Sequence, residues 1–490
     1  MRKSGILMHI SSLPNPYGIG TVGKCAREFV DFLHDAGQTV WQILPLSPTG
    51  CGNSPYQSFS AFAGNPYLID LDELIEQGLL TRQEVEAVCW ASEEGRVDYG
   101  VLYRERLQLL RLAYDRFVPD EEFEQFVAEN ALWLEDYALF MVLKERFEGR
   151  PWQSWSLSLM MRLPEMMEVC LREYAQEIRF RYFLQYTFFT QWKALRQYAN
   201  SRGIRILGDV PIYVPLDSAD VWSAPHLFQL DGSCRPTMVA GCPPDSFTAE
   251  GQLWGNPLYN WDVMKQHGYS WWIRRLEAAA KMFDAVRLDH FRGFESYWAV
   301  PAGAENAVGG SWQPGPGMDF LQAVRTALPH LELIAEDLGY VTPEVRRLQE
   351  QSGYPGMKVI QFAFDSREAG NYLPDTYTEN SVCYSGTHDN PTLAQWLEEV
   401  APKDLEEAVQ YLGLSKEEGL VRGLLRGCME SVSRLCVIQL QDWLELGAEA
   451  RMNTPGTVSD GNWTWRAQPG CLTKELAERI REMTEQYGRI

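Results

Sequence analysis

The sequence predicts an α/β protein, a (β/α)8 TIM barrel that carries helical and loop-rich insertions at the C-terminal rim of its strands. Short apolar runs alternate along the chain with amphipathic stretches, which is the pattern of a parallel sheet covered by helices. Several runs are unbroken in Val, Ile and Leu, as expected of strands buried on both faces. The eight predicted strands, the number that closes such a barrel, are residues 5–11, 39–46, 204–210, 285–288, 331–335, 358–364, 381–385 and 437–444.

The helices and insertions follow from what lies between these runs. Apolar residues at helical spacing predict amphipathic helices at 26–36 and 188–198. Residues 70–203, between the second and third strands, are rich in Glu, Leu, Arg and Trp and predict a mainly helical subdomain. Residues 215–270, between the third and fourth strands, are rich in turns and predict a loop-rich subdomain at the same rim. Because active sites of barrels form at the rim that such insertions decorate, we expect one catalytic domain over 1–490.

The composition narrows the class of protein. Hydrophobic residues make up 45% and charged residues 22% of the 490 residues, as in soluble globular proteins. A formal net charge of −22 argues against nucleic acid and anionic membrane surfaces as partners. No apolar run is long enough to span a membrane, and no secretory signal is recognisable. The ten cysteines are scattered without metal-ligand spacing, so we expect free thiols, a cytoplasmic protein and no metal site.

Carboxylates stand at the ends of four predicted strands. Asp209, Asp289, Glu336 and Asp389 lie at or just after an apolar run, where a charge is costly unless it is paired or functional. Each one, taken singly, is also explained as a cap of the following helix. Because the strand ends of a barrel converge on one axis, all four would share one pocket. Crowded like charges raise some pKa values, so one residue type then supplies both an acid and a base.

Paired carboxylates indicate cleavage of a glycosidic bond, in which one protonates the leaving oxygen and the other attacks or activates water. The sequence has no G-x-S-x-G, P-loop or H-E-x-x-H motif that would indicate another chemistry. Its 17 Trp, 22 Tyr and 21 Phe fit a sugar-binding surface, although aromatic residues are more often part of a core. The residues by themselves therefore predict a site of the retaining α-glycosidase type.

Short motifs are spread over the whole chain: SSLP at 11–14, WQILPL at 41–46, SPYQS at 54–58, GDVPIY at 208–213, GCPPD at 241–245, GQLWGNP at 251–257, RLDHFRG at 287–293, AEDLG at 335–339, GTHDN at 386–390 and RMNTPG at 451–456. Together they resemble glycoside hydrolase family 77, the amylomaltase or disproportionating-enzyme family of the α-amylase clan. The resemblance implies a 4-α-glucanotransferase, which transfers α-1,4-glucan segments from a donor malto-oligosaccharide to the 4-hydroxyl of an acceptor glucan or glucose.

The resemblance also implies the catalytic roles. Asp289 is expected to be the nucleophile that forms a glycosyl-enzyme, and Glu336 the general acid/base. Asp389 is expected to hold hydroxyls of the sugar being transferred. Arg287, two residues before the nucleophile and on the same strand face, is expected to keep Asp289 ionised and oriented. A retaining mechanism predicts the carboxyls of Asp289 and Glu336 about 5–5.5 Å apart, and it needs no cofactor because the acids supply the proton transfers.

The remaining implied contacts are to sugar. His388 and Asp209 are expected to bind hydroxyls of the transferred sugar, and Tyr56 to stack beneath it. The resemblance makes the insertion at 215–270 a lid or acceptor-site subdomain. Within it, residues 251–257 contain two glycines around a Gln-Leu-Trp core, which makes them a lid candidate in which Trp254 stacks on an acceptor sugar.

For several residues next to the predicted site residues, the sequence suggests roles other than catalysis. Strand alternation predicts that His290 points away from the site, and Asp337 is expected to cap a helix or bind a backbone N–H. Arg451, Asn453 and Asn462 fit either sugar binding or loop capping.

Malto-oligosaccharides, amylose, starch or glycogen are the expected substrates, with glucose as an acceptor. The alternative within the enzymes is an α-glucan hydrolase of the amylase type. A non-catalytic glucan-binding protein is the alternative from another class, but it predicts loss of at least one of Asp289, Glu336 and Asp389, and all three are present.

Overall fold

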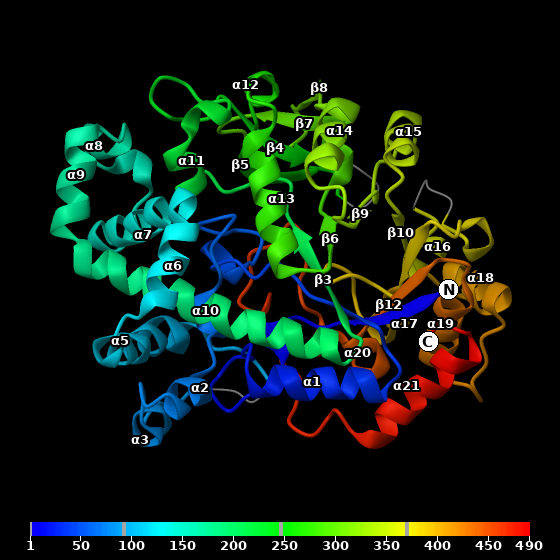
Figure 1. Ribbon diagram of the computed structural model, residues 1–490. Coiled ribbons are helices and arrows are strands. Elements are labelled where there is room, and N and C mark those ends of the chain that lie inside the picture. The colour runs from blue at the N-terminus through cyan, green and yellow to red at the C-terminus, as the bar shows by residue number, and fades with distance from the viewer. Residues whose placement is uncertain (1, 91–94, 245–247, 368–371) are drawn as a thin grey trace.

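A closed barrel forms the centre of the computed structural model, which describes residues 2–90, 95–244, 248–367 and 372–490. Among these residues, eight parallel strands close the barrel in the order β1-β12-β11-β10-β9-β6-β3-β2 (Figure 1). The predicted (β/α)8 barrel is confirmed. Its strands are β1 (Lys3–Leu7), β2 (Val40–Gln42), β3 (Arg205–Val210), β6 (Ala285–Leu288), β9 (Leu333–Ala335), β10 (Gly356–Val359), β11 (Ser381–Tyr384) and β12 (Leu435–Gln439).

Four predicted strands run too far at their carboxyl ends. The strand predicted at 39–46 ends at Gln42, and the other three are those at 5–11, 358–364 and 437–444. In these three, helical turns take the place of the last residues, at Ile10–Ser12, at α16 (Ile360–Ala363) and at α20 (Leu440–Trp443). A continuous apolar run does not distinguish a buried strand from a buried helical turn. Because these turns bury apolar side chains at the barrel rim just as the strands do, the sequence pattern carries no sign of the change.

Helices cover the outside of the barrel, and several of them connect consecutive strands. The helices predicted at 26–36 and 188–198 correspond to α1 and to part of α10. None of the helices in the described ranges is both long and apolar enough to cross a membrane. The covering helices are α1 (Lys24–Asp35), α10 (Ala175–Ser201), α13 (Ser270–Met282), α14 (Gly317–Ala327), α15 (Pro343–Ser352), α17 (Leu393–Glu399), α18 (Pro402–Leu412), α19 (Leu420–Glu430) and α21 (Lys474–Gln486).

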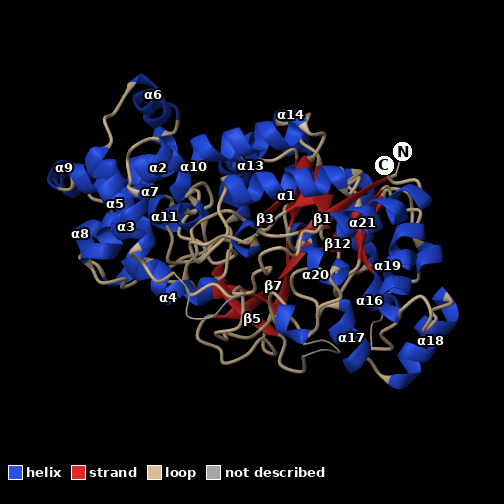
Figure 2. Cartoon of the chain, turned by 90° about the horizontal axis from the view of Figure 1, so that it is seen from below, coloured by secondary structure: helices blue, strands red, loops and turns tan. Residues whose placement is uncertain are grey.

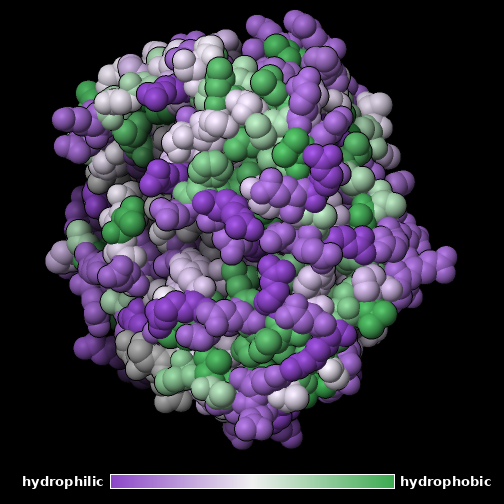
Figure 3. Space-filling model, turned by 90° about the vertical axis from the view of Figure 1, so that its left-hand side faces the viewer, coloured by the Kyte–Doolittle hydropathy of each residue, from purple (hydrophilic) through white to green (hydrophobic). Residues whose placement is uncertain are grey.

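A lobe of helices lies beside the barrel, and its chain runs between β2 and β3 (Figures 1 and 2). The long helix α10 packs against α5, α6, α7 and α9 and returns the chain to β3. The outer face of the lobe is mainly hydrophilic, with hydrophobic side chains scattered over it (Figure 3). Its other helices are α2 (Leu71–Glu76), α3 (Arg82–Glu86), α4 (Tyr99–Val101), α5 (Leu107–Arg116), α6 (Glu121–Glu129), α7 (Ala131–Arg146), α8 (Leu157–Met160) and α9 (Pro164–Glu173).

A second, antiparallel sheet has the strand order β5-β4-β7-β8. Its strands β4 (Met238–Cys242) and β5 (Gln252–Pro257) lie within the insertion at 215–270, with the short helices α11 (Ala219–Ser223) and α12 (Trp261–Gln266). The strands β7 (Ser296–Pro301) and β8 (Ser311–Pro314) follow β6, and the sequence analysis does not predict them. Asp245, the last residue of the motif at 241–245, lies outside the described residues.

The two ends of the chain lie side by side, next to β1 and β12 (Figure 1). Arg489 is fully buried there and donates hydrogen bonds to the backbone carbonyls of Met429, Lys3, Ser433 and Ser431. A buried guanidinium is tolerated because these carbonyls satisfy its donors. The last turn of the chain thereby ties the first barrel strand to the segment before the last one.

Candidate active site

An open cleft of about 2110 Å³ lies at the carboxyl ends of the barrel strands. This is the end of a parallel barrel where catalytic residues gather. The second sheet, through Trp254 and its neighbours on β5, contributes part of the cleft wall. Seven of the eight predicted site residues line this cleft: Tyr56, Trp254, Arg287, Asp289, Glu336, His388 and Asp389. The eighth, Asp209, lies behind the wall.

Arg287 holds two of the predicted carboxylates. Its Nη1 lies 2.7 Å from Oδ2 of Asp209 and 3.0 Å from Oδ1 of Asp289. Asp209 on β3 is in register with Arg287 on β6, and Arg287 precedes Asp289 by two residues, so backbone pairing brings all three together. Burial lowers the pKa of Arg287, but its carboxylate neighbours raise it further, so the guanidinium stays charged. The ion pair between Arg287 and Asp289 fixes the direction of the Asp289 carboxylate.

Glu336 follows β9 and has backbone rather than cationic partners. The N–H of His290 donates to its Oε2 at 2.6 Å, and the N–H of Leu338 donates to its Oε1 at 3.2 Å. Burial raises the pKa of Glu336 to about 8; Arg287 opposes this shift and Asp289 adds to it. Glu336 is therefore protonated at neutral pH, which is the starting state that a general acid requires.

His290 turns the chain directly after Asp289. Because β6 ends at Leu288, the strand alternation that predicted an outward side chain no longer applies at position 290. His290 adopts left-handed backbone angles, φ 48° and ψ 50°, and lines the cleft; the expectation that it points away is wrong. Its ring meets Trp254 edge to face at 4.7 Å. Burial lowers its pKa to about 3, so the ring is neutral.

Asp389 lies on the loop after β11, with its side chain 42% exposed toward the cleft. Asn453 donates from Nδ2 to its Oδ1 at 2.6 Å, and Arg451 donates from Nη2 to its backbone carbonyl at 2.7 Å. Asn462 accepts from the N–H of Thr454 through its Oδ1. All three residues line the cleft and hydrogen-bond loop residues, and two of them set the position of Asp389; sugar binding by these residues stays a prediction.

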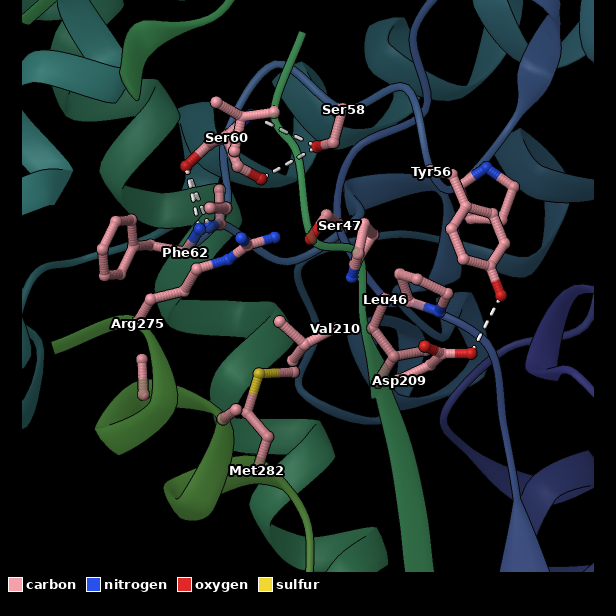
Figure 4. A pocket seen from close by; sticks show the side chains of 18 of the residues that line it. Leu46, Ser47, Tyr56, Ser58, Ser60, Phe62, Asp209, Val210, Arg275 and Met282 are labelled. Atoms are coloured by element: carbon pink, nitrogen blue, oxygen red, sulfur yellow. Dashed lines mark hydrogen bonds between the residues drawn. The ribbon is translucent and has the colours of Figure 1, made fainter. Parts of the chain in front are cut away.

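Tyr56 connects Asp209 with His388. Its hydroxyl donates to Oδ2 of Asp209 at 2.9 Å (Figure 4). Its ring stacks on His388 at 5.0 Å and 18°. The side chain of Asp209 has no exposed surface, and it borders a small cavity of about 50 Å³ on the other side of the wall. Burial raises the pKa of Asp209, while Arg287 lowers it. Its contacts are to Tyr56 and Arg287, and binding of a sugar hydroxyl by Asp209 stays a prediction.

Two segments beside the catalytic candidates, residues 252–257 and Asp337, can also be compared with their predicted roles. Residues 252–257, expected within a lid, form strand β5 at the edge of the second sheet, with Trp254 partly exposed in the cleft. Asp337 accepts from the N–H of Met357 at 2.7 Å, so its expected role as a partner of a backbone N–H is confirmed.

Trp463 is a cleft residue that the sequence analysis missed, with its ring 5.7 Å from both Tyr56 and His388. The only local signal is an aromatic residue that follows Gly461 and Asn462 in a glycine-containing loop. Within the described ranges, no group of three or more His, Cys, Asp or Glu side chains is arranged to hold a metal ion.

The barrel and the cleft at its strand ends, which Asp289, Glu336 and Asp389 line, fit one class of protein: a barrel enzyme that acts on glycosidic bonds. Residues 8–473 match glycoside hydrolase family 77, described as 4-alpha-glucanotransferase. The chain therefore belongs to this 4-alpha-glucanotransferase family.

Individual relatives agree with this assignment. The chain is 46% identical over 486 residues to the 4-alpha-glucanotransferase of Clostridium butyricum, covering 98% of this chain and 100% of the relative. It is 47% identical over 502 residues to that of Thermus thermophilus, covering 100% of this chain and 99% of the relative. The structure of an amylomaltase from Streptococcus agalactiae in complex with acarbose superposes with a TM-score of 0.97 at 40% identity, covering 100% of both chains.

Proposed function

We propose that this glucanotransferase works by a retaining double displacement through a glycosyl-aspartate at Asp289, with Glu336 as the acid/base. The observation that carries the proposal is the pair of contrasting carboxylates in one cleft. Asp289 is ion-paired to Arg287 at 3.0 Å, whereas burial raises the pKa of Glu336 to about 8. One is therefore suited to attack and the other to donate a proton.

In the first step, Glu336 donates its proton to the glycosidic oxygen of the donor glucan. The bond between that oxygen and the anomeric carbon breaks, and a carboxylate oxygen of Asp289 forms a bond to the same carbon. The shorter glucan or glucose leaves with the proton as its new 4-hydroxyl. Asp389, oriented by Asn453 and open to the cleft, binds hydroxyls of the sugar whose anomeric carbon reacts.

In the second step, the ionised Glu336 takes the proton from the 4-hydroxyl of the acceptor. The acceptor oxygen attacks the anomeric carbon, and the bond to Asp289 breaks. Two inversions leave the α configuration unchanged. Water in place of the acceptor would give hydrolysis, so the ratio of transfer to hydrolysis depends on how well the cleft binds the acceptor sugar. Trp254 is partly exposed in the cleft beside His290, and this position supports acceptor binding.

The substrates follow from this chemistry. We propose malto-oligosaccharides, amylose, starch or glycogen as donors, glucose and shorter glucans as acceptors, and the cytoplasm as the place of action.

The test is product analysis on maltotriose. Two maltotriose molecules should give glucose and maltopentaose, then longer chains, while the number of reducing ends stays constant. Asp289→Asn should reduce this transfer by at least about 10³-fold, and Asp319→Asn, at a 60% exposed aspartate on α14, should leave it unchanged. A steady rise of reducing ends would favour the hydrolase, and an active Asp289→Asn variant would refute the assigned nucleophile.

A further inference from the structure

An exposed tyrosine stands in the cleft four residues beyond Glu336. Tyr340 is 62% exposed and belongs to the cleft wall. Its ring stacks on that of Trp312, a residue of β8, at 6.1 Å and 19°. Only one face of the Tyr340 ring can be covered in this way, so the other face is left for solvent or a ligand.

Buried groups hold this aromatic pair in place. Arg292 is 2% exposed, and its guanidinium lies 3.7 Å above the Trp312 ring. The same side chain donates from Nη1 to the carbonyl of Tyr340 at 2.7 Å and from Nη2 to the hydroxyl of Ser296 at 2.9 Å. Trp312 also packs edge to face on Trp298 at 5.1 Å. The exposed ring is thus supported by a buried cation and two tryptophans, which restricts its motion before any ligand arrives.

The chemistry of the pair fits a sugar face. The C–H groups on one side of a pyranose ring pack on an aromatic face, and stacking needs a flat, rigid ring with one side accessible. The guanidinium of Arg292 lies 5.7 Å from the centroid of the Tyr340 ring and belongs to its support. Stacking on such a ring holds a sugar by its C–H face and does not specify one hydroxyl pattern. Such a surface suits a repeating glucan.

The position of the pair selects the acceptor side. Under the proposed function, Trp254 binds the acceptor. Trp312 on β8 belongs to the same sheet as Trp254 on β5, and Tyr340 lines the same cleft as Trp254, so we place Tyr340 on the acceptor side. Tyr56 and His388 lie with Asp389, on the donor side. Four residues of backbone span at most about 14 Å, which is within the length of a short oligosaccharide but away from the reacting bond.

We propose that Tyr340, backed by Trp312, binds a sugar of the acceptor glucan beyond the unit that receives the transferred chain. The inference rests on the proposed function. It makes the platform of Tyr340 and Trp312 a determinant of acceptor length: maltotriose and longer acceptors gain a stacked sugar, whereas glucose is too short to reach the platform.

The test separates donor from acceptor chemically. A maltoheptaoside whose non-reducing 4-hydroxyl is blocked serves as donor but not as acceptor. Glucose, maltose, maltotriose and maltopentaose, each labelled at the reducing end, serve as acceptors. Because maltotriose and longer acceptors can also act as donors, KM and kcat are measured for each from the initial rate of labelled products that carry the blocked terminus. Tyr340→Ala should raise the KM of maltotriose and maltopentaose about fivefold, or about 1 kcal/mol, and leave kcat and the KM of glucose unchanged. Tyr340→Phe retains the ring and should behave like the wild type, and Trp312→Ala should raise the same KM values as Tyr340→Ala.

Tyr411→Ala is the matched control, because Tyr411 is a 40% exposed tyrosine on α18 that does not line the cleft. Equal effects of Tyr340→Ala on glucose and maltopentaose would overturn the proposal, because they would mean that the loop merely positions Glu336. An unchanged KM for every acceptor would overturn it as well. If the wild type transfers nothing from the blocked donor to any acceptor, the proposed function itself fails; normal transfer to glucose in Tyr340→Ala keeps the two failures distinct.

Discussion

Replacing Glu336 by Gln should abolish transfer and yet stabilise the folded protein at alkaline pH. Burial raises the pKa of this carboxyl from its ordinary value of 4.5 to about 8. At about 1.4 kcal/mol for each pKa unit, the folded state disfavours the ionised form by at most about 5 kcal/mol. The site faces an open cleft, so solvent screening reduces this to about 2 kcal/mol. Gln is neutral at every pH and avoids this cost.

The sign of the pH dependence follows from linkage. A group whose pKa is raised on folding contributes stability at low pH that is lost as pH rises from its unfolded value through its folded value. Wild-type stability should therefore fall, relative to Glu336→Gln, between about pH 5 and pH 8 and stay lower above that window. The N–H groups of His290 and Leu338 bind the ionised carboxylate more strongly than Gln. The bond from His290 lowers the pKa of Glu336, and the value of about 8 already includes this effect.

Urea unfolding of both proteins, followed by tryptophan fluorescence at pH 5, 7 and 9, measures the difference. The free energy of unfolding of Glu336→Gln minus that of the wild type should increase by about 2 kcal/mol from pH 5 to pH 9. Glu28→Gln, at a 61% exposed glutamate on α1, is the control and should show no such increase. A difference that is constant with pH would refute the reasoning that burial keeps Glu336 protonated.

Three further predictions concern the groups around the acid. Arg287→Met should lower the free energy of unfolding, measured in urea, by about 3 kcal/mol, because the buried carboxylate of Asp209 loses its cation. The double variant with Asp209→Asn should regain part of this free energy but should not regain transfer. Asn453→Ala should lower kcat of maltotriose transfer about tenfold with little change in the thermal midpoint, because the carboxylate of Asp389 loses the bond that orients it. Arg489→Met should lower the free energy of unfolding by about 3 kcal/mol, seen as a lower urea midpoint, and leave kcat at 25 °C unchanged.

The sequence predicts the barrel well because its strands are apolar runs of a kind that parallel sheets bury on both faces. The four strand-end carboxylates could be placed near one another for the same reason: parallel strands end together. None of the four strands of the second sheet is among the predicted strands. β8 (Ser311–Pro314) is four residues long and mostly polar, and it pairs with β7 (Ser296–Pro301) across a turn-rich segment, so neither length nor alternation marks it as a strand.

Some details of the site could not be predicted for a different reason. They depend on backbone angles and packing, which cannot be inferred from residue type. A left-handed conformation is expected of glycine, yet His290 adopts it, and the turn brings its N–H to Glu336 and its ring to Trp254. The burial of Asp209 is similar: the sequence places it at a strand end, but only packing decides that Tyr56 and Arg287 lie between it and the cleft.

The contrast between Asp289 and Glu336 has a compact physical origin. The described part of the cleft places a single guanidinium, Arg287, against the carboxylates of Asp209 and Asp289, while Glu336 on the neighbouring strand receives only backbone N–H groups. A cation alone does not decide the matter, since Asp209 also touches Arg287 and yet burial raises its pKa. What distinguishes Asp289 is that it has both the cation and access to the cleft, with its side chain 26% exposed. The proposed roles therefore depend on two features together: the contact of Asp289 with Arg287 and the exposure of the Asp289 side chain to the cleft.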